Sequence, residues 1–390
     1  MPRRILFNFG YYRKGWIAPI ESLGPEIEVV YIFYTSPDQE LEKFTSHRVI
    51  YWDDFTSAQH LLDEIAPERI VFMSIDSIYS ITLNFVAHKR GIETFILQHG
   101  VYSTYKEYRQ RDKRTKKIEE KKQTIPVVRT NAFGFFKASL KLKDVFSFIK
   151  FPFYLFAKRS QGVFYANYWF TFNAKKPSYY ISYTPHTARY FEETERPEKD
   201  QLLFIGNPDM DPFFAPVPPN PFTGKYYLLI DQAMADNRYG QVIYTIQQAI
   251  NFYLKLNAFC LSKGARMKVK LHPESYHSNW LPRHENIDWI KDGDLPALIH
   301  HAEGCFGYFS SLIVPALYFN RCVLFKVVNH DLVTDAHTWG MAQLLDYNTF
   351  TFDEIDFSGV SKHGVGAFVN RYLHFKTGNS FDRLGDILMQ

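Results

Sequence analysis

Cysteine is scarce in this sequence, with three residues among 390. Cys260, Cys305 and Cys322 lie in apolar stretches and lack the CxxC spacing that is typical of zinc sites. Their small, odd number also argues against a disulfide framework. The cysteine content therefore favours a reducing, cytosolic compartment.

Excess charge of one sign and long apolar runs are also missing. The 45 Lys and Arg residues nearly balance the 41 Asp and Glu residues, and a net charge of +4 is too small to indicate a nucleic-acid-binding protein. The apolar run before Gly10 is too short for a signal peptide, and no stretch reaches the ~18 apolar residues of a membrane-spanning helix. Any membrane contact is expected to be peripheral.

Apolar and aromatic residues are plentiful. They include 36 Phe and 26 Tyr, and hydrophobic residues make up 46% of the chain, which excludes a disordered or low-complexity protein. Short β-rich runs alternate with helical patterns, which is typical of an α/β fold with parallel strands. Strands are expected at residues 3–9, 26–33, 47–52, 69–74, 93–98, 179–184, 201–206, 226–231, 266–273, 304–311 and 322–327, and helices at 57–65, 78–89, 241–261, 294–301, 362–375 and 381–388.

The alternation is interrupted twice. A basic and aromatic insertion is expected at about 102–178, and five prolines between Pro212 and Pro221 predict a linker at 212–224. The sequence therefore predicts two Rossmann-like domains that face a cleft, an acceptor-side domain at 1–211 and a nucleotide-binding domain at 225–390.

Polar residues follow three strands of the second domain. The strand at 226–230 runs into Asp231 and Gln232, the strand at 266–271 into His272 and Pro273, and the strand at 304–309 into Ser310 and Ser311. Ligands of open α/β sheets bind beyond the carboxyl ends of the strands, so these residues are expected along one edge of one sheet.

This set of residues suits a phosphate. Lys270, an imidazolium at His272 and the two serine hydroxyls would all donate to phosphate oxygens. Pro315 predicts a helix that starts close to Leu312, with the serines at its cap. Each motif alone also fits a plain helix cap or turn, whereas their joint occurrence at neighbouring strand ends favours a site.

The spacing of these motifs resembles that of a known enzyme group. His272-Pro273, followed about forty residues later by Ser310-Ser311, resembles the HP and SS motifs of bacterial GT-B glycosyltransferases that use CMP-sugars: sialyltransferases, polysialyltransferases and Kdo transferases. The resemblance implies that His272, Ser310 and Ser311 hold the phosphate and nearby parts of the CMP donor.

Two further runs extend the resemblance to roughly residues 93–101 and 179–330. Gln98-His99-Gly100 and the run from Ile205 to Asp211 are similar to elements of a wider group, which includes CDP-glycerol phosphotransferases and UDP-N-acetylglucosamine 2-epimerases. In the phosphotransferases the histidine of the HG motif has a base role, which the resemblance carries to His99. A structural role in a turn is the alternative for His99.

The catalytic carboxylate is expected in the loop after the first of the three strands. Gln232 to Asp236, in the form Gln-x-x-x-Asp, resembles the segment that supplies the catalytic aspartate of Kdo transferases, so Asp236 is the first candidate. Asp231 is the second candidate, because an acidic residue is the base in inverting sialyltransferases. A lone carboxylate after a strand also fits a helix cap or turn.

No metal or other cofactor is expected. The histidines at 300, 301, 330 and 337 and Glu303 show no spacing of a known ligand set. The glycosyltransferases that the sequence resembles mostly work without an obligatory metal.

The insertion combines positive charge with aromatic residues. Residues 106–122 contain nine basic and four acidic residues, with Lys113, Arg114, Lys116 and Lys117 at their centre. From Phe133 to Arg159, aromatic and aliphatic residues alternate with lysines. Such a surface suits an anionic membrane, while a solvated charged helix or a grip on a polyanionic acceptor are the alternatives.

The sequence thus predicts a bacterial enzyme, cytoplasmic and peripheral at the inner face of the membrane, that transfers sialic acid or Kdo from CMP to a glycan or glycolipid of the capsule or lipopolysaccharide. The first alternative is a CDP-polyol (glycerol or ribitol) phosphotransferase. The second is a nucleic-acid-binding protein that uses the insertion, which the near-neutral remainder of the chain disfavours.

Overall fold

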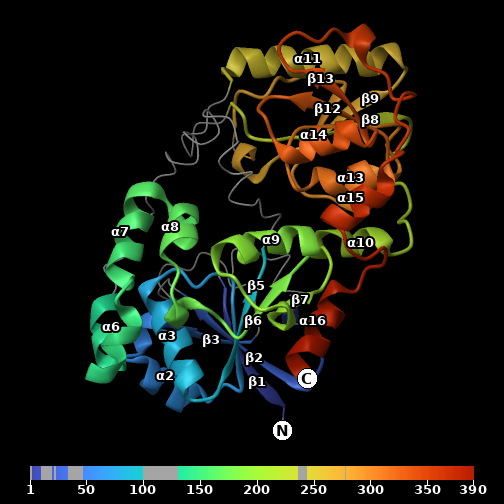
Figure 1. Cartoon of the computed structure of the whole chain (residues 1–390). Coiled ribbons are helices and arrows are strands. Elements are labelled where there is room, and N and C mark those ends of the chain that lie inside the picture. Colours follow the sequence, from blue (N-terminus) through green and yellow to red (C-terminus); the bar gives the residue numbers. More distant parts are fainter. Residues whose placement is uncertain are drawn as a thin grey trace. The chain divides into compact units, whose positions relative to one another are not determined.

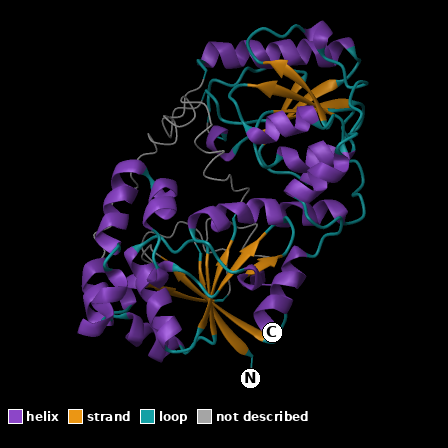
Figure 2. Ribbon diagram, in the orientation of Figure 1, coloured by secondary structure: helices purple, strands orange, loops and turns teal. Residues whose placement is uncertain are grey.

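A computed structural model describes residues 2–9, 20–21, 23–33, 47–99, 131–235, 244–276 and 278–390. The described chain divides into two units (Figures 1 and 2). The N-terminal unit comprises the described residues up to Pro208 together with Asn379–Gln390, and the C-terminal unit comprises Asp209–Gly378.

The N-terminal unit is built on a seven-stranded sheet in the order β3-β2-β1-β4-β5-β6-β7, in which every pair is parallel. The strands are β1 (Arg3–Asn8), β2 (Ile27–Phe33), β3 (Arg48–Tyr51), β4 (Arg69–Phe72), β5 (Glu93–Leu97), β6 (Tyr179–Ser182) and β7 (Leu202–Phe204). Its helices are α2 (Ala58–Ile65), α3 (Ile78–Lys89), α6 (Ala132–Ser139), α7 (Phe151–Gln161), α8 (Val163–Phe170), α9 (Pro185–Thr194) and α16 (Ser380–Met389).

Both faces of this sheet are buried, as the apolar composition of its strands predicts. Leu6, Val30 and Phe72 belong to a core that also contains residues of α2, α3 and α6. Successive side chains of a strand point to opposite faces, so Ile5 and Phe7 belong to a second core.

The C-terminal helix α16 completes the second core. Leu384 and Leu388 are fully buried in it, and Arg3 and Arg69 of the sheet donate to the carbonyls of Leu388 (3.1 Å) and Ile387 (3.0 Å). The predicted domain boundaries therefore need correction at the C-terminus, because residues 379–390 lie in the N-terminal unit. Asp209–Asp211 lie in the C-terminal unit rather than the N-terminal one.

The C-terminal unit is built on a six-stranded sheet in the order β10-β9-β8-β11-β12-β13, again entirely parallel. The strands are β8 (Tyr226–Ile230), β9 (Arg266–Lys270), β10 (Ile287–Ile290), β11 (Cys305–Gly307), β12 (Cys322–Lys326) and β13 (Ala342–Asp346). The helices are α10 (Asp211–Phe214), α11 (Ile246–Ser262), α12 (Leu295–His300), α13 (Ile313–Phe319), α14 (Asp331–Thr338) and α15 (Val365–Tyr372). The expected fold, two Rossmann-like units with parallel sheets, is confirmed.

The described part of the predicted insertion is helical. After α6 comes the 3-10 helix η3 (Leu142–Phe148), then α7 and α8, and then the 3-10 helix η4 (Asn173–Lys175). The described helices include none that is both long and apolar enough to cross a membrane. All three cysteines are buried and unpaired.

A buried ion pair holds the end of this insertion to the N-terminal unit. Lys175 of η4 bonds to Glu195, which follows α9, and both side chains are 2% exposed. The hydroxyl of Tyr180 on β6 donates to the second carboxylate oxygen of Glu195 at 2.8 Å. The carboxylate thus links three segments of the chain through buried side chains.

We expect Glu195→Gln to lower the free energy of unfolding by about 3 to 5 kcal/mol, because the change leaves the Lys175 ammonium buried without its counter-charge. The matched control is Glu64→Gln, which breaks an ion pair with Arg48 whose side chains are both 47% exposed. Exposed pairs contribute less than about 1 kcal/mol. Urea denaturation measures both variants, and equal small losses would contradict the structural role of the buried pair.

Candidate active site

The switch point of the C-terminal sheet carries the predicted site. Strand β8 comes first along the chain and lies between β9 and β11, so the direction of winding reverses at β8. The crevice at such a reversal is where open α/β sheets bind ligands. Asp231, His272 and Ser310 follow β8, β9 and β11, and the predicted adjacency of these three strand ends is confirmed.

Asp231 is buried at the centre of this edge, with 3% of its surface exposed. Its N–H donates to the carbonyl of Lys270 at 3.0 Å, and its Oδ1 accepts a hydrogen bond from the hydroxyl of Tyr253 at 2.9 Å. Burial raises the pKa of Asp231 to about 7, although hydrogen bonds from Tyr253 and from the backbone of Gln232 and His272 lower it. The carboxyl group therefore changes its charge near neutral pH.

Tyrosines surround Asp231, and the sequence-based prediction missed them. Tyr253 comes from α11 and Tyr308 directly follows β11, and both are buried. Tyr347 stacks between Tyr244 and Phe252, with ring centroids 4.1 Å and 4.4 Å away. The high tyrosine content of the sequence was the available signal for such a cluster. Which tyrosines lie near Asp231 depends on contacts between residues far apart in the sequence.

Two described residues on either side of Asp236 bond to each other. The N–H of Tyr244 donates to the carbonyl of Met234 at 3.1 Å, so the two ends of the segment between them are held together at the end of β8. Asp236 itself lies outside the described residues.

Gln232, next to Asp231, is half-buried. Its side-chain oxygen Oε1 is buried and has no hydrogen-bond partner within the described part of the chain. A buried acceptor without a partner is costly, and a donor group on a ligand would remove that cost.

His272 is half-buried at the end of β9, before the 3-10 helix η7 (Pro273–Ser275). Burial lowers the pKa of His272, and the charge of Lys270 lowers it further. The lowered pKa favours the neutral ring rather than the expected imidazolium. A bound phosphate would favour the protonated ring by its negative charge.

Lys270 points toward the neighbouring edge of the sheet. Its Nζ donates to the carbonyl of Lys291 at 2.6 Å and to that of Leu271 at 3.3 Å. The ammonium is thus held by backbone oxygens beside His272, where it adds positive charge to the strand end.

The two serines precede helix α13 but do not cap it. The N-cap residue is Leu312, close to the predicted start, and it makes no side-chain capping bond. The Ser310 hydroxyl accepts from the N–H of Leu312 at 3.3 Å, whereas Ser311 is exposed and its hydroxyl has no partner among the described residues. Gly307, at the end of β11, lies close to the start of helix α13. A Cβ at this position would lie 2.4 Å from Cδ1 of Ile313, so glycine allows the helix to approach the strand.

The predicted residues of the first domain lie in the N-terminal unit, after β5. Gln98 is fully buried, and its Oε1 accepts from the N–H of Tyr183 at 3.0 Å and from the hydroxyl of Ser182. His99 lines a cavity of about 220 Å³ together with Asp76 and Asn167, two polar residues that the sequence analysis did not single out.

Several predicted residues lie outside the described part of the chain. They are Gly100, Lys113, Arg114, Lys116, Lys117 and Asp236. Among the residues that the structure does describe, no three or more His, Cys, Asp or Glu side chains come together in a way that could hold a metal ion.

Solved structures of glycosyltransferases share this fold over the whole chain. The glycotransferase of kitacinnamycin is 13% identical, with a TM-score of 0.54, and the comparison covers 100% of this chain and 98% of that one. The calicheamicin glycosyltransferase CalG4 is 13% identical, with a TM-score of 0.52 and coverage of 100% and 98%. The wall teichoic acid polymerase TagF is 13% identical, with a TM-score of 0.56 and coverage of 100% and 89%.

No match was found among curated protein sequences. The sequence profile of the alpha-2,8-polysialyltransferase (POLYST) family, in contrast, matches residues 32–325, which include all three strand ends of the site. The fold is that of GT-B glycosyltransferases, as the HP and SS motifs predicted. The chain is therefore a glycosyltransferase that belongs to the alpha-2,8-polysialyltransferase family.

Proposed function

We propose that the protein transfers a 2-keto sugar acid, sialic acid or Kdo, from its CMP donor to a bacterial surface glycan. The observation that carries the proposal is the convergence of His272, Ser310 and the Asp231–Gln232 pair at the switch point of the C-terminal sheet. Membership of the polysialyltransferase family supports a sialic acid donor and a capsule glycan acceptor.

The donor phosphate would lie over the ends of β9 and β11. Ser311 offers an exposed hydroxyl, His272 a ring N–H, and Lys270 a nearby positive charge. The buried Oε1 of Gln232 is an acceptor for a donor group of the nucleotide or sugar. Pro273 begins the turn that holds His272 at this edge.

The reaction forms one bond and breaks one. The acceptor hydroxyl oxygen attacks the anomeric carbon, the bond from that carbon to the phosphate oxygen breaks, and CMP leaves with the electron pair. Asp236 would take the acceptor's proton in a single displacement, or would form a sugar ester that the acceptor then displaces. His99 is the corresponding candidate in the N-terminal unit for contact with the acceptor hydroxyl.

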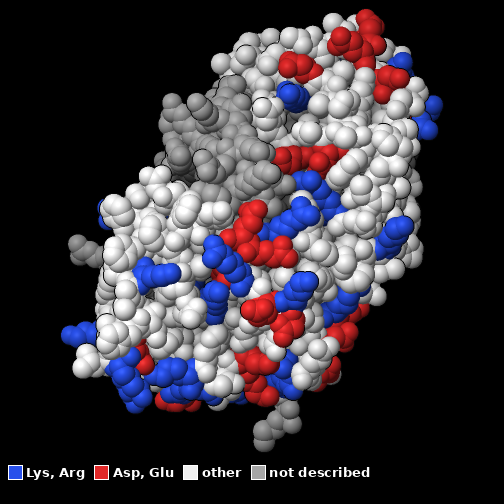
Figure 3. All heavy atoms as spheres, viewed as in Figure 1, with Lys and Arg blue, Asp and Glu red and all other residues white. Residues whose placement is uncertain are grey.

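We further propose that the enzyme works at the anionic inner surface of the membrane, and that no metal cofactor takes part. Eight exposed apolar side chains on the segment 131–170 form what we call the hairpin surface: Phe133, Leu142, Val145, Phe146, Ile149, Phe153, Phe156 and Trp169. Leu142 is 89% exposed and Phe156 74%. Figure 3 shows few charged atoms over α7 and α8.

The charges of the segment 131–170 also support contact with an anionic membrane surface. The only carboxylate between residues 131 and 170 is Asp144, which is buried and paired with Lys89 at 2.7 Å. Six basic residues of this segment accompany the apolar ones: Lys137, Lys141, Lys143, Lys150, Lys158 and Arg159. Cationic and aromatic side chains together favour an anionic membrane surface, and Lys113, Arg114, Lys116 and Lys117 would add to the attraction.

A CDP-polyol phosphotransferase is the second candidate, favoured by the Gln98-His99 motif. The test is the product: the enzyme is incubated with CMP-sialic acid or CDP-glycerol and an acidic oligosaccharide, and the product is analysed by mass spectrometry. A mass increase of one sugar acid without phosphorus supports the proposal, and a product that contains phosphorus supports the alternative.

Removal of the proposed phosphate contacts should weaken donor binding. We expect His272→Ala, and separately the double change Ser310→Ala with Ser311→Ala, to reduce CMP-donor affinity by roughly tenfold to a hundredfold, because hydrogen bonds to charged groups contribute about 1.5 to 3 kcal/mol each. The control is His363→Ala, an exposed histidine of the same unit. Unchanged affinity in both site variants, measured by calorimetry, would refute the phosphate assignment.

Asp236→Asn should leave donor affinity nearly intact and reduce turnover by several orders of magnitude, because it removes stabilisation of the transition state and not of the ground state. Intact-mass spectrometry of the wild-type enzyme with donor and no acceptor tests for a covalent sugar adduct at Asp236. Near-normal turnover of the Asn variant would exclude Asp236 as base and as nucleophile.

The ionisation of Asp231 should make the free energy of unfolding depend on pH. Between its ordinary pKa of 3.8 and the folded-state pKa of about 7, the folded protein binds more protons than the unfolded chain, so stability falls as the pH rises through this window. The loss amounts to up to roughly 4 kcal/mol. Asp231→Asn should remove this dependence and Asp292→Asn, at an exposed site, should retain it, as urea denaturation at pH 5 and pH 8 would show. The same pH dependence in both variants would contradict the raised pKa.

A further inference from the structure

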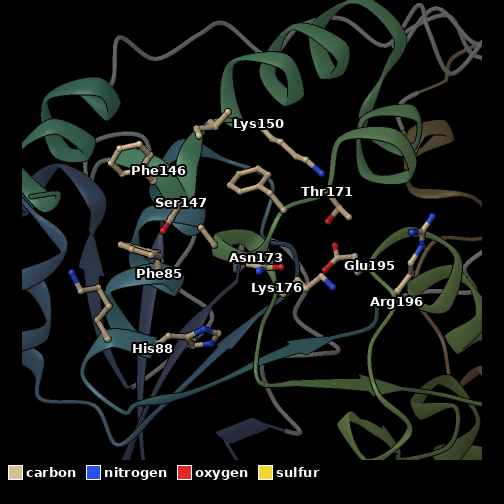
Figure 4. A pocket seen from close by; sticks show the side chains of 14 residues that line it. Phe85, His88, Phe146, Ser147, Lys150, Thr171, Asn173, Lys176, Glu195 and Arg196 are labelled. Carbon is tan, nitrogen blue, oxygen red and sulfur yellow. The ribbon is translucent and has the colours of Figure 1, made fainter. Parts of the chain in front are cut away.

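The N-terminal unit contains a second, larger depression that none of the roles above uses. It is an open groove of about 780 Å³, lined by residues of α3, of the segment Phe146–Lys150, of the segment Thr171–Lys176 and of the chain after α9. Figure 4 shows Phe85, Phe146 and Lys150 together with Lys176, Glu195 and Arg196 around this groove.

The groove is positively charged. Lys150, Lys176 and Arg196 line it, and the described part of the chain offers no ion-pair partner to any of the three. Glu195 is the one carboxylate among the lining residues, and it is already bonded to Lys175 and Tyr180. Unpaired cations from separate segments of the chain therefore face the same space.

The groove also has an apolar side, which is continuous with the hairpin surface. Phe85 and Phe172 form part of its wall. Phe146 and Ile149 line it as well, and they are 79% and 61% exposed. Near these side chains, Oγ1 of Thr171 is buried without a partner among the described residues.

We propose that this groove binds one anionic phospholipid of the membrane. Its phosphate would pair with Lys150, Lys176 and Arg196, and its acyl chains would leave the groove over Phe146 and Ile149 toward the bilayer that the hairpin surface contacts. An acidic glycan would also match the cations, but it would not cover the apolar rim. The inference rests on the membrane association proposed above and does not depend on the identity of the sugar donor.

The test uses two forms of lipid with the full chain. Vesicles of phosphatidylcholine, with and without phosphatidylglycerol, measure membrane association. Short-chain dihexanoyl phosphatidylglycerol below its micelle concentration measures the groove itself, by calorimetry. The groove variant carries Lys150→Gln, Lys176→Gln and Arg196→Asn, and asparagine is chosen because residue 196 has a φ of 52°.

The control variant carries Lys137→Gln, Lys141→Gln and Lys143→Gln, which remove the same charge from the same unit outside the groove. We expect one short-chain lipid per wild-type chain, about a hundredfold weaker binding of this lipid to the groove variant, and unchanged binding of this lipid to the control variant. The fold-change follows from about 1 kcal/mol for each basic side chain near an anionic surface. Donor binding should be equal in all three proteins.

Three results would overturn the proposal. Vesicle binding without binding of the short-chain lipid would leave membrane association standing and reject the groove as its site. Equal binding of glycerol phosphate and of the short-chain lipid would assign the groove to a soluble anion, because the apolar rim would then contribute nothing. Binding of a sialic acid oligomer in place of the lipid would assign it to the glycan.

Discussion

The position of β8 between β9 and β11 is the constraint on which the candidate active site depends. Parallel pairing aligns the three carboxyl ends, and the register that pairs Ile230 with Lys270 and Leu229 with Phe306 brings Asp231, Leu271 and Tyr308 to one level. Residues that are about forty positions apart along the chain thereby lie at one edge of the sheet. A phosphate needs several donors around it at once, and this strand order brings the segments that follow β9 and β11 to one edge of the sheet.

The polar residues at this edge differ in how deeply they are buried. Asp231 is buried and is bonded to Tyr253 and to the backbone of β9. Ser311 and the ring of His272 remain accessible to a ligand. The lowered pKa favours the neutral ring of His272, so binding of a phosphate is expected to be coupled to proton uptake by this ring.

Sequence patterns predicted most strands and helices, because central parallel strands are apolar on both faces and surface helices repeat every 3.6 residues. The prediction missed β10 and β13, edge strands with half-buried residues and weak patterns, as well as α9 and α14. It placed α16 in the wrong domain, since an amphipathic helix shows that it has an apolar face but not which sheet covers it.

In the site, motif spacing identified the strand ends. It did not predict the Tyr253–Asp231 bond or the groove, which depend on tertiary contacts.

The proposed use of a CMP donor is tested most directly by the thermal stability of the protein in the presence of CMP, CDP, UMP or UDP. A ligand that binds only the folded state raises the melting temperature according to its affinity. We expect the largest increase in melting temperature with CMP. This increase should be lost when His272 or the two serines are replaced. No increase with CMP, together with a clear increase with UDP, would contradict it.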